Sequence, residues 1–96
     1  GTNNLDSEQV EPKWEHVLTI VSVENATTNY TKLRIGILNA GVFEPFFEQL
    51  TPVAASLYTL AEPITLHEGD KLRAVLTGAT ASDALSMYVH GFRRML

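Results

Sequence analysis

The sequence predicts an all-β domain, either an antiparallel β-sandwich or a jelly-roll-like small barrel of about seven strands. Short runs in which apolar and polar residues alternate recur along most of the chain. Clusters of Gly, Pro, Asn and Asp interrupt these runs roughly every 8–12 residues, as turns do in such folds. The run WEHVLTIVSV, residues 14–23, is also rich in β-branched residues, which favour strands.

Size and composition limit what this domain can be. The chain has 96 residues, of which 45% are hydrophobic and 19% charged, the balance of one ordinary globular domain. Area scaling predicts that folding buries roughly 64% of the unfolded surface, enough for one thin core. The net charge of −4 repels nucleic acid, and no apolar run approaches the ~20 residues that span a membrane, so we expect neither partner. Because cysteine is absent, the fold uses no disulfide, thiolate nucleophile or cysteine zinc site.

The first residues predict a flexible N-terminal arm. Residues 1–12, GTNNLDSEQVEP, are polar, lack apolar periodicity and end at Pro12. Two interpretations remain open: a disordered terminus, or an arm that becomes ordered on a neighbouring subunit. Residues 13–96 are then predicted to form a single β-sandwich domain.

The first predicted strand, residues 14–23, is apolar on both faces. Leu18 and Ile20 point one way, and the other face carries Val17, Thr19, Val21 and Val23. A strand of this kind is expected to be covered on both sides, by the core and by a partner. The cluster ENATTN, residues 24–29, predicts the turn that follows.

The second predicted strand, residues 31–38, alternates well. Its inward positions are Leu33, Ile35 and Ile37, and an Asn-Ala-Gly turn ends it.

The third predicted strand, residues 42–50, alternates less well. Phe43 and Phe47 lie on one face, whereas Phe46 shares the other face with two glutamates. Pro45 has no amide hydrogen for a ladder, so this strand belongs at a sheet edge or at a bulge.

Four shorter elements complete the pattern. LYTL (57–60) and ITL (64–66) are short strands separated by Pro63, and KLRAVLT (71–77) has an inward face of Leu72, Ala74 and Leu76. The last segment, ALSMYVHGF, has apolar residues at both helical and strand spacing. Its shortness and the surrounding β pattern favour a strand, and a helix over residues 81–92 remains the alternative.

A cluster of titratable residues in ITLHEGDKLRAVLTG, residues 64–78, raises the question of a site. His67, Glu68 and Asp70 lie together at a reversal between two strands. Gly69 supplies the backbone dihedral of a tight turn, and Asp70 can accept hydrogen bonds from the turn backbone. A metal would need further ligands, and the other two histidines stand alone in predicted strands. We therefore predict a turn and no metal site.

No motif predicts catalysis. None of the serines lies in a Gly-x-Ser-x-Gly elbow, and there is no glycine-rich phosphate loop. Glu44 and Glu48 share one strand face and are interpreted as a solvated acidic edge. We thus expect no enzyme activity, no catalytic residue and no cofactor. Trp14, Tyr30 and Tyr58 could stack a sugar or a base, so a carbohydrate- or ligand-binding β-sandwich module remains the alternative function.

Two runs of the chain carry a resemblance. They are WEHVLTIVSVENATTNYTKLRIGI and YTLAEPITLHEGDKLRAVLTGATASDALSMYVHGF. They combine a strand ending in an Asn-rich turn, an alternating strand, and a hairpin of the form apolar-x-Leu-x-x-Gly-Asp-x-Leu. A loop containing Asp83 and a final hydrophobic strand follow. Over more than half of the chain, this order is similar to small β-sandwich proteins of tailed bacteriophages; residues 41–57 have no counterpart.

The resemblance implies a virion structural protein: a head (capsid) decoration, head–tail or fibre-associated protein, assembled in the host cytoplasm and located in the virion. Such proteins are non-enzymatic and act through self-association and protein–protein contacts. We expect a homo-oligomer that also contacts other virion proteins. The candidate interface residues are apolar side chains opposite the predicted core faces, namely Val17, Val21, Val23 and Phe46.

Overall fold

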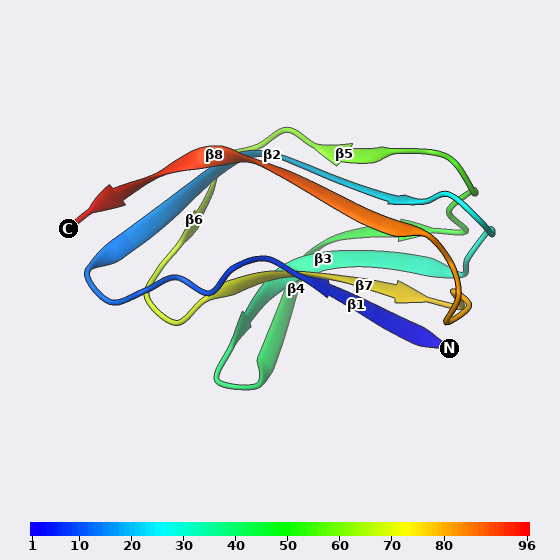
Figure 1. Cartoon of the computed structure of the whole chain (residues 1–96), viewed down its shortest axis with the longest axis horizontal. Coiled ribbons are helices and arrows are strands. Elements are labelled where there is room, and N and C mark those ends of the chain that lie inside the picture. Colours follow the sequence, from blue (N-terminus) through cyan, green and yellow to red (C-terminus); the bar gives the residue numbers. More distant parts are fainter.

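The protein is a two-layer β-sandwich. The computed structural model describes residues 1–96 and contains eight strands and no helix. The strands form two antiparallel sheets that pack face to face (Figure 1). The all-β sandwich prediction is confirmed, with one strand more than the sequence predicted. With no helix present, none is long and apolar enough to cross a membrane.

The first sheet has the strand order β1-β7-β3-β4. It consists of β1 (Thr2–Asp6), β7 (Lys71–Thr77), β3 (Lys32–Asn39) and β4 (Val42–Leu50). The free edges of this sheet are therefore β1 and β4. The β3–β4 hairpin extends beyond the two layers at the bottom of Figure 1.

The second sheet is built around one long central strand, β2 (Trp14–Asn25). Along one side, β2 pairs over its whole length with β8 (Leu85–Met95). Along the other side, it pairs first with β6 (Ile64–Leu66) and then with β5 (Tyr58–Leu60). The strand predicted for the ambiguous last segment is confirmed, because β8 is a strand of 11 residues.

The core lies between the two sheets, and the two best-alternating strands supply five of its 12 buried residues. Its fully buried members on β3 and β7 are Leu33, Ile35, Leu72, Ala74 and Leu76. Successive residues of a strand point to opposite faces, so alternate apolar residues fill one layer boundary. The inward faces predicted for these strands are thus confirmed, although Ile37 is only partly buried.

A β-bulge in β2 overturns the predicted faces of that strand. Leu18 pairs with Gly91 and Ile20 pairs with His90, so Thr19 is an extra residue without an opposite neighbour. The extra residue reverses the alternation. Consequently Leu18 before the bulge and two valines after it, Val21 and Val23, all point into the core.

Two of the candidate interface residues were therefore misplaced by the sequence prediction. Val21 and Val23 are fully buried within the chain and do not lie on the face opposite Leu18. An uninterrupted period of two predicts the wrong face after residue 19. Gly91 accommodates the bulge, because a Cβ there would overlap the Val17 carbonyl oxygen and lie 2.8 Å from the Leu18 Cα.

The N-terminal segment is not a flexible arm but an eighth strand with a docked linker. β1 pairs with β7 from Thr2 opposite Thr77 to Asp6 opposite Arg73. After it, the Ser7 amide donates to the Leu72 carbonyl at 2.8 Å. An edge strand is held by its backbone ladder, which requires no apolar periodicity, and this explains why the polar sequence gave no strand signal.

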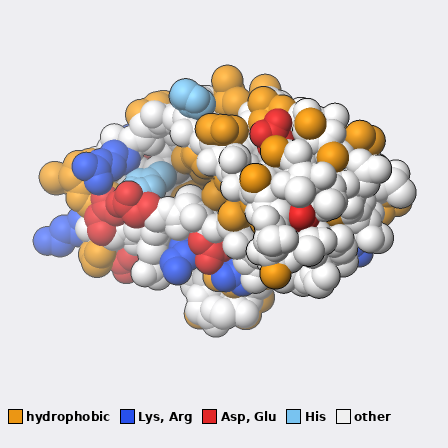
Figure 2. Space-filling view, turned by 45° about the vertical axis from the view of Figure 1, so that its right-hand side comes forward, with side chains coloured by type: hydrophobic (Ala, Val, Ile, Leu, Met, Phe, Trp, Pro, Cys, Tyr) orange, Lys and Arg blue, Asp and Glu red, His pale blue; other side chains and the backbone are white.

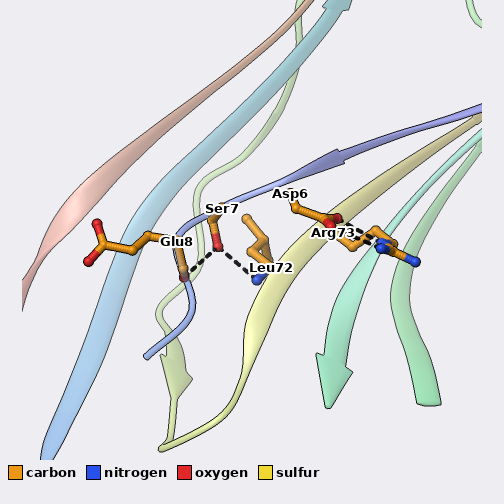
Figure 3. Close-up of polar contacts among 5 residues, drawn as sticks. All are labelled: Asp6, Ser7, Glu8, Leu72 and Arg73. Atoms are coloured by element: carbon orange, nitrogen blue, oxygen red, sulfur yellow. Dashed lines mark hydrogen bonds and ion pairs between the residues drawn. The ribbon is translucent and has the colours of Figure 1, made fainter. Parts of the chain in front are cut away.

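Side chains add to this attachment, as Figure 3 shows. Arg73 donates two hydrogen bonds to the Asp6 carboxylate, at 2.7 and 2.9 Å. This pairing holds the pKa of Asp6 below its ordinary value. The Ser7 hydroxyl accepts a hydrogen bond from the Leu72 amide at 2.8 Å and donates to the Glu8 carbonyl at 3.3 Å. Val10, further along the linker, is buried in the core.

The strand that contains Pro45 lies where the sequence placed it, at a sheet edge and at a bulge. β4 is the outermost strand of the first sheet. Ile35 pairs with Phe47 and Gly36 pairs with Pro45, which leaves Phe46 as the extra residue. Gly36 is required at this point, because a Cβ on it would lie 2.6 Å from the Pro45 Cα.

Candidate functional site

The titratable cluster at residues 67–70 is a turn, as predicted. It connects β6 of the second sheet to β7 of the first. The Asp70 carboxylate accepts a hydrogen bond from the His67 amide at 2.8 Å and another from the Asn39 side chain at 2.7 Å. The Asp70 amide donates to the His67 carbonyl at 2.9 Å, and Gly69 has a φ of 84°. The aspartate therefore stabilises the turn with its own side chain.

A second charged cluster, which the sequence did not reveal, lies where β2 begins and β8 ends. Its members are Glu11, Glu15, His16, His67, Arg93 and Arg94. Acidic, basic and histidine side chains gather at this end of the molecule in Figure 2. No spacing in the sequence connects residues 11–16 with 93–94; the antiparallel β2–β8 pairing brings them together.

Ion pairs use the acids of this cluster. Arg94 donates to Glu15, whose side chain is nearly buried, and the His67 Nδ1 lies 3.8 Å from the same carboxylate. Arg93 donates to Glu11 at 3.2 Å and also lies over the Trp14 ring, 5.1 Å from its centroid. These contacts fix the end of β8 to the start of β2.

His16 is, after Glu15, the most enclosed titratable side chain of the cluster, with 13% of its side chain exposed. Its Nε2 lies 3.4 Å from a Glu11 carboxylate oxygen, in a geometry that does not form a hydrogen bond. The pKa of Glu11 is lowered, mainly by a hydrogen bond with its own backbone and further by His16 and Arg93. No group of three or more His, Asp or Glu side chains is placed to share a metal ion. The contacts between the members of the cluster are ion pairs.

The molecule has shallow grooves and no deep cleft. One groove opens beside β8 and is lined by Glu8, His16, Leu18, Val89, Gly91, Phe92 and Arg93. Another lies on β4, against Arg34 and the segment that contains Phe46. A third is bounded by the linker and the 67–70 turn. A substrate pocket normally encloses most of its ligand, which these openings do not.

The outer face of the second sheet carries exposed apolar side chains around His90, and we call this surface the β2–β8 face. It is formed by Val17, Ile20, Tyr88, His90 and Phe92. The exposed fractions are 41% for Ile20, 53% for Tyr88 and 55% for Phe92. Figure 2 shows apolar side chains gathered along this upper layer. Exposed apolar residues that adjoin one another mark an interaction surface more often than scattered ones do.

The structure separates the four candidate interface residues. Val17 lies on the β2–β8 face, where it pairs with Phe92. Phe46 is 45% exposed but lies on β4, at the edge of the other sheet. The sequence prediction missed Ile20, Tyr88 and Phe92. Tyr88 and Phe92 could have been found from β8 itself, where they alternate with the apolar residues that point inward.

The three aromatic residues considered for sugar stacking do not form a platform. Tyr30 is buried, and burial raises the pKa of its hydroxyl to about 12. The Tyr58 hydroxyl accepts a hydrogen bond from the Val53 amide at 2.8 Å. Trp14 packs partly against the core and carries Arg93 on its ring. These side chains therefore stabilise the fold.

No family model matches this sequence, and neither a curated protein nor a solved structure matches the chain. The functional interpretation consequently depends on the surface geometry and on the resemblance described above.

Proposed function

We propose that this chain is a non-enzymatic virion structural protein of a tailed bacteriophage, located in the virion after assembly in the host cytoplasm. It acts through self-association and through contacts with other virion proteins. The observation that carries the assembly part is the β2–β8 face, where Ile20, Tyr88 and Phe92 are exposed together on one sheet. The virion part is supported by the resemblance of residues 14–37 and 58–92 to small phage β-sandwich proteins.

The non-enzymatic character is supported by the state of the titratable groups. Glu11 and Glu15 are paired with arginines, and Asp70 stabilises a turn. An enzyme of this size would require a reactive group and a water-excluding pocket, and the grooves are shallow.

Self-association is tested by light scattering coupled to size exclusion over a range of micromolar concentrations. We expect a mass larger than that of one chain, which decreases on dilution. A single-chain mass at every concentration would contradict the assembly part of the proposal. The virion part is tested by the genes that flank the coding sequence: capsid and tail genes support it, whereas glycosidase modules support the alternative.

The alternative function, a carbohydrate- or ligand-binding module, is favoured by one specific observation. Tyr88 and Phe92 expose their rings on the same sheet face, and aromatic faces of this kind bind sugars and other flat ligands. Titration calorimetry with soluble polysaccharides tests it. Binding that is lost in both Tyr88→Ala and Phe92→Ala, in a chain that remains monomeric, would favour this alternative.

A further inference from the structure

We propose that two copies of this chain join through the free edges of β8, antiparallel about a two-fold axis at His90, so that their second sheets become one continuous sheet. This inference rests on the proposed self-association and assigns it to the β8 edge, which borders the β2–β8 face. The occupant of the β8 edge is thus a second copy of the same strand.

The backbone of β8 has a row of groups without a strand partner. The Ala84 carbonyl accepts from the Ala26 amide at 3.0 Å, and the Leu96 amide donates to the Lys13 carbonyl at 2.8 Å. The His90 carbonyl accepts from the Thr19 hydroxyl at 3.2 Å. The backbone amide and carbonyl groups of the even-numbered residues of β8 therefore point towards β2. Because neighbouring residues of a strand point their amide and carbonyl groups to opposite sides, the odd-numbered residues of β8 present theirs at the open edge.

Every other sheet edge carries a feature that hinders strand addition. β4 contains Pro45, which has no amide hydrogen, and a bulge at Phe46. β1 has only five residues and ends at Asp6. β5 and β6 have three residues each and are separated by Pro63. By contrast, β8 has 11 residues, contains no proline and has no Asp, Glu, Lys or Arg before Arg93. Long, regular, apolar edges of this kind pair with further strands.

The sequence of β8 is complementary to itself when it is paired antiparallel about His90. On the outer face, Tyr88 lies opposite Phe92 of the second copy, and aromatic pairs of this type stabilise sheets. On the inner face, Val89 lies opposite Gly91, so the valine meets the position that has no side chain. The aromatic contact occurs twice, once on each side of the axis.

The same register also separates the positive charges. Arg93 lies opposite Met87 and Arg94 opposite Ser86, so no arginine faces an arginine of the second copy. It is also the register in which all residues from Leu85 to Met95 find a partner. A shift by one residue would place inward-facing side chains opposite outward-facing ones, which the pleat forbids.

A cysteine at position 90 tests this geometry, because the natural chain has no cysteine. Odd-numbered residues form the hydrogen bonds across the proposed junction, so the two His90 residues make a non-hydrogen-bonded pair with Cα atoms about 4.5 Å apart. A disulfide accepts Cα separations of roughly 4.4–6.8 Å. We expect His90→Cys to convert mostly to a disulfide-linked dimer under mild oxidation, as seen on a non-reducing gel.

Ser86→Cys is the matched control, on the same strand and the same face. In the proposed register, the two copies of residue 86 are displaced by eight residues, or about 26 Å, so this variant should not cross-link. Equal cross-linking of both variants would overturn the register. If the natural chain is oligomeric by light scattering but His90→Cys does not cross-link, the β8 junction is wrong while self-association stands. If the natural chain is monomeric, both the junction and the proposed self-association fail.

Discussion

The two long edge strands, β4 and β8, occupy equivalent positions in their sheets but differ in where the bulge lies. In β4 the extra residue, Phe46, is in the edge strand itself, next to Pro45. Beside β8, the extra residue is Thr19 on the inner strand β2. A bulge interrupts the ladder of the strand that contains it. It follows that a bulge hinders the addition of a further strand only when the edge strand itself contains the bulge. The β8 strand remains regular although its neighbour β2 contains a bulge.

Charge strengthens the difference. Glu44 and Glu48 lie on β4, and Arg34 donates to Glu48 at 2.7 Å. Charged side chains on an edge oppose the approach of another strand. The apolar side chain of Phe46 is thus exposed on an edge that is hindered, whereas Tyr88 and Phe92 are exposed on one that is open. Exposure alone does not distinguish the two edges.

The largest expected effect concerns the core that both edges share. Ile35→Ala removes a fully buried side chain from β3, the strand that supports β4. We expect the free energy of unfolding, measured by urea denaturation, to decrease by about 2–5 kcal/mol because the substitution leaves a cavity. A loss near zero would mean that Ile35 does not face the core.

Val21→Thr has the next largest expected effect and tests the reversed face of β2. Val21 is fully buried beside β8, so its replacement buries a hydroxyl group without a built-in partner. We expect the free energy of unfolding, measured by urea denaturation, to decrease by about 1–3 kcal/mol. The oligomer mass of the folded variant should stay that of the natural chain, because Val21 is not at the surface. A variant with a smaller oligomer mass and an unchanged free energy of unfolding would show that Val21 does lie at the interface.

Tyr88→Lys against Phe46→Lys tests the comparison of the two edges directly. Both residues are aromatic and about half exposed, one on each edge strand. Lysine at position 88 removes both aromatic cross-strand contacts and adds a charge to the open edge, so we expect the dimer Kd from sedimentation to rise at least about tenfold, or ~1.4 kcal/mol. Phe46→Lys should leave the Kd unchanged. The reverse result would assign the interface to β4.

The sequence predicted the regular strands well and the irregular ones poorly, for physical reasons. Leu33, Ile35 and Leu72 were assigned correctly, because each lies in a strand without interruption before it. The bulge at Thr19 could not be read from the sequence: neither Thr19 nor its neighbours differ from ordinary strand residues. The one residue that reflects the bulge is Gly91, far along the chain, because a side chain at that position would overlap the backbone of β2 at the bulge.

The candidate surface was predicted only in part. Val17 is partly exposed and Phe46 is exposed, as expected. Tyr88 and Phe92 were missed because residues 81–92 fitted a helix as well as a strand, so the alternation in β8 did not identify an outer face. β1 escaped detection because backbone hydrogen bonds to β7 hold it, and these have no side-chain signature.

Asp83→Asn tests whether the β8 edge depends on how β8 begins. Asp83 precedes β8, and its carboxylate accepts hydrogen bonds from the Thr28 hydroxyl, the Asn25 side chain at 2.9 Å and the Thr80 amide at 2.8 Å. The hydrogen bonds from Thr28 and Asn25 hold the pKa of Asp83 below its ordinary value of 3.8. A lowered folded pKa contributes stability above pH ~4 that is lost as the pH falls through the folded pKa.

We therefore expect Asp83→Asn to have a lower free energy of unfolding than the natural chain at pH 7. It should also lose less of that free energy as the pH falls through the lowered pKa of the paired carboxylate. Urea denaturation at several pH values measures this, with the exposed Glu62→Gln as the control. If the loss of unfolding free energy at low pH is the same in Asp83→Asn as in the natural chain, Asp83 does not contribute to that loss. If the dimer Kd of Asp83→Asn stays that of the natural chain, the open edge does not depend on this anchor.

Tyr30→Phe has the smallest expected effect and should leave both edges unchanged. The Tyr30 hydroxyl is buried without a hydrogen-bond partner, so its removal should be neutral or should stabilise the fold by up to about 1 kcal/mol. Burial raises the folded pKa of Tyr30 from 10.0 to about 12, with Tyr58 adding to the shift. The raised pKa means that the folded state favours the neutral hydroxyl. The stability of the natural chain is therefore unaffected by this group below pH ~10 and decreases as the pH rises towards ~12. The phenylalanine variant should lose less stability over that interval in alkaline denaturation, and a variant that is clearly destabilised at pH 7 would show that the hydroxyl is hydrogen-bonded after all.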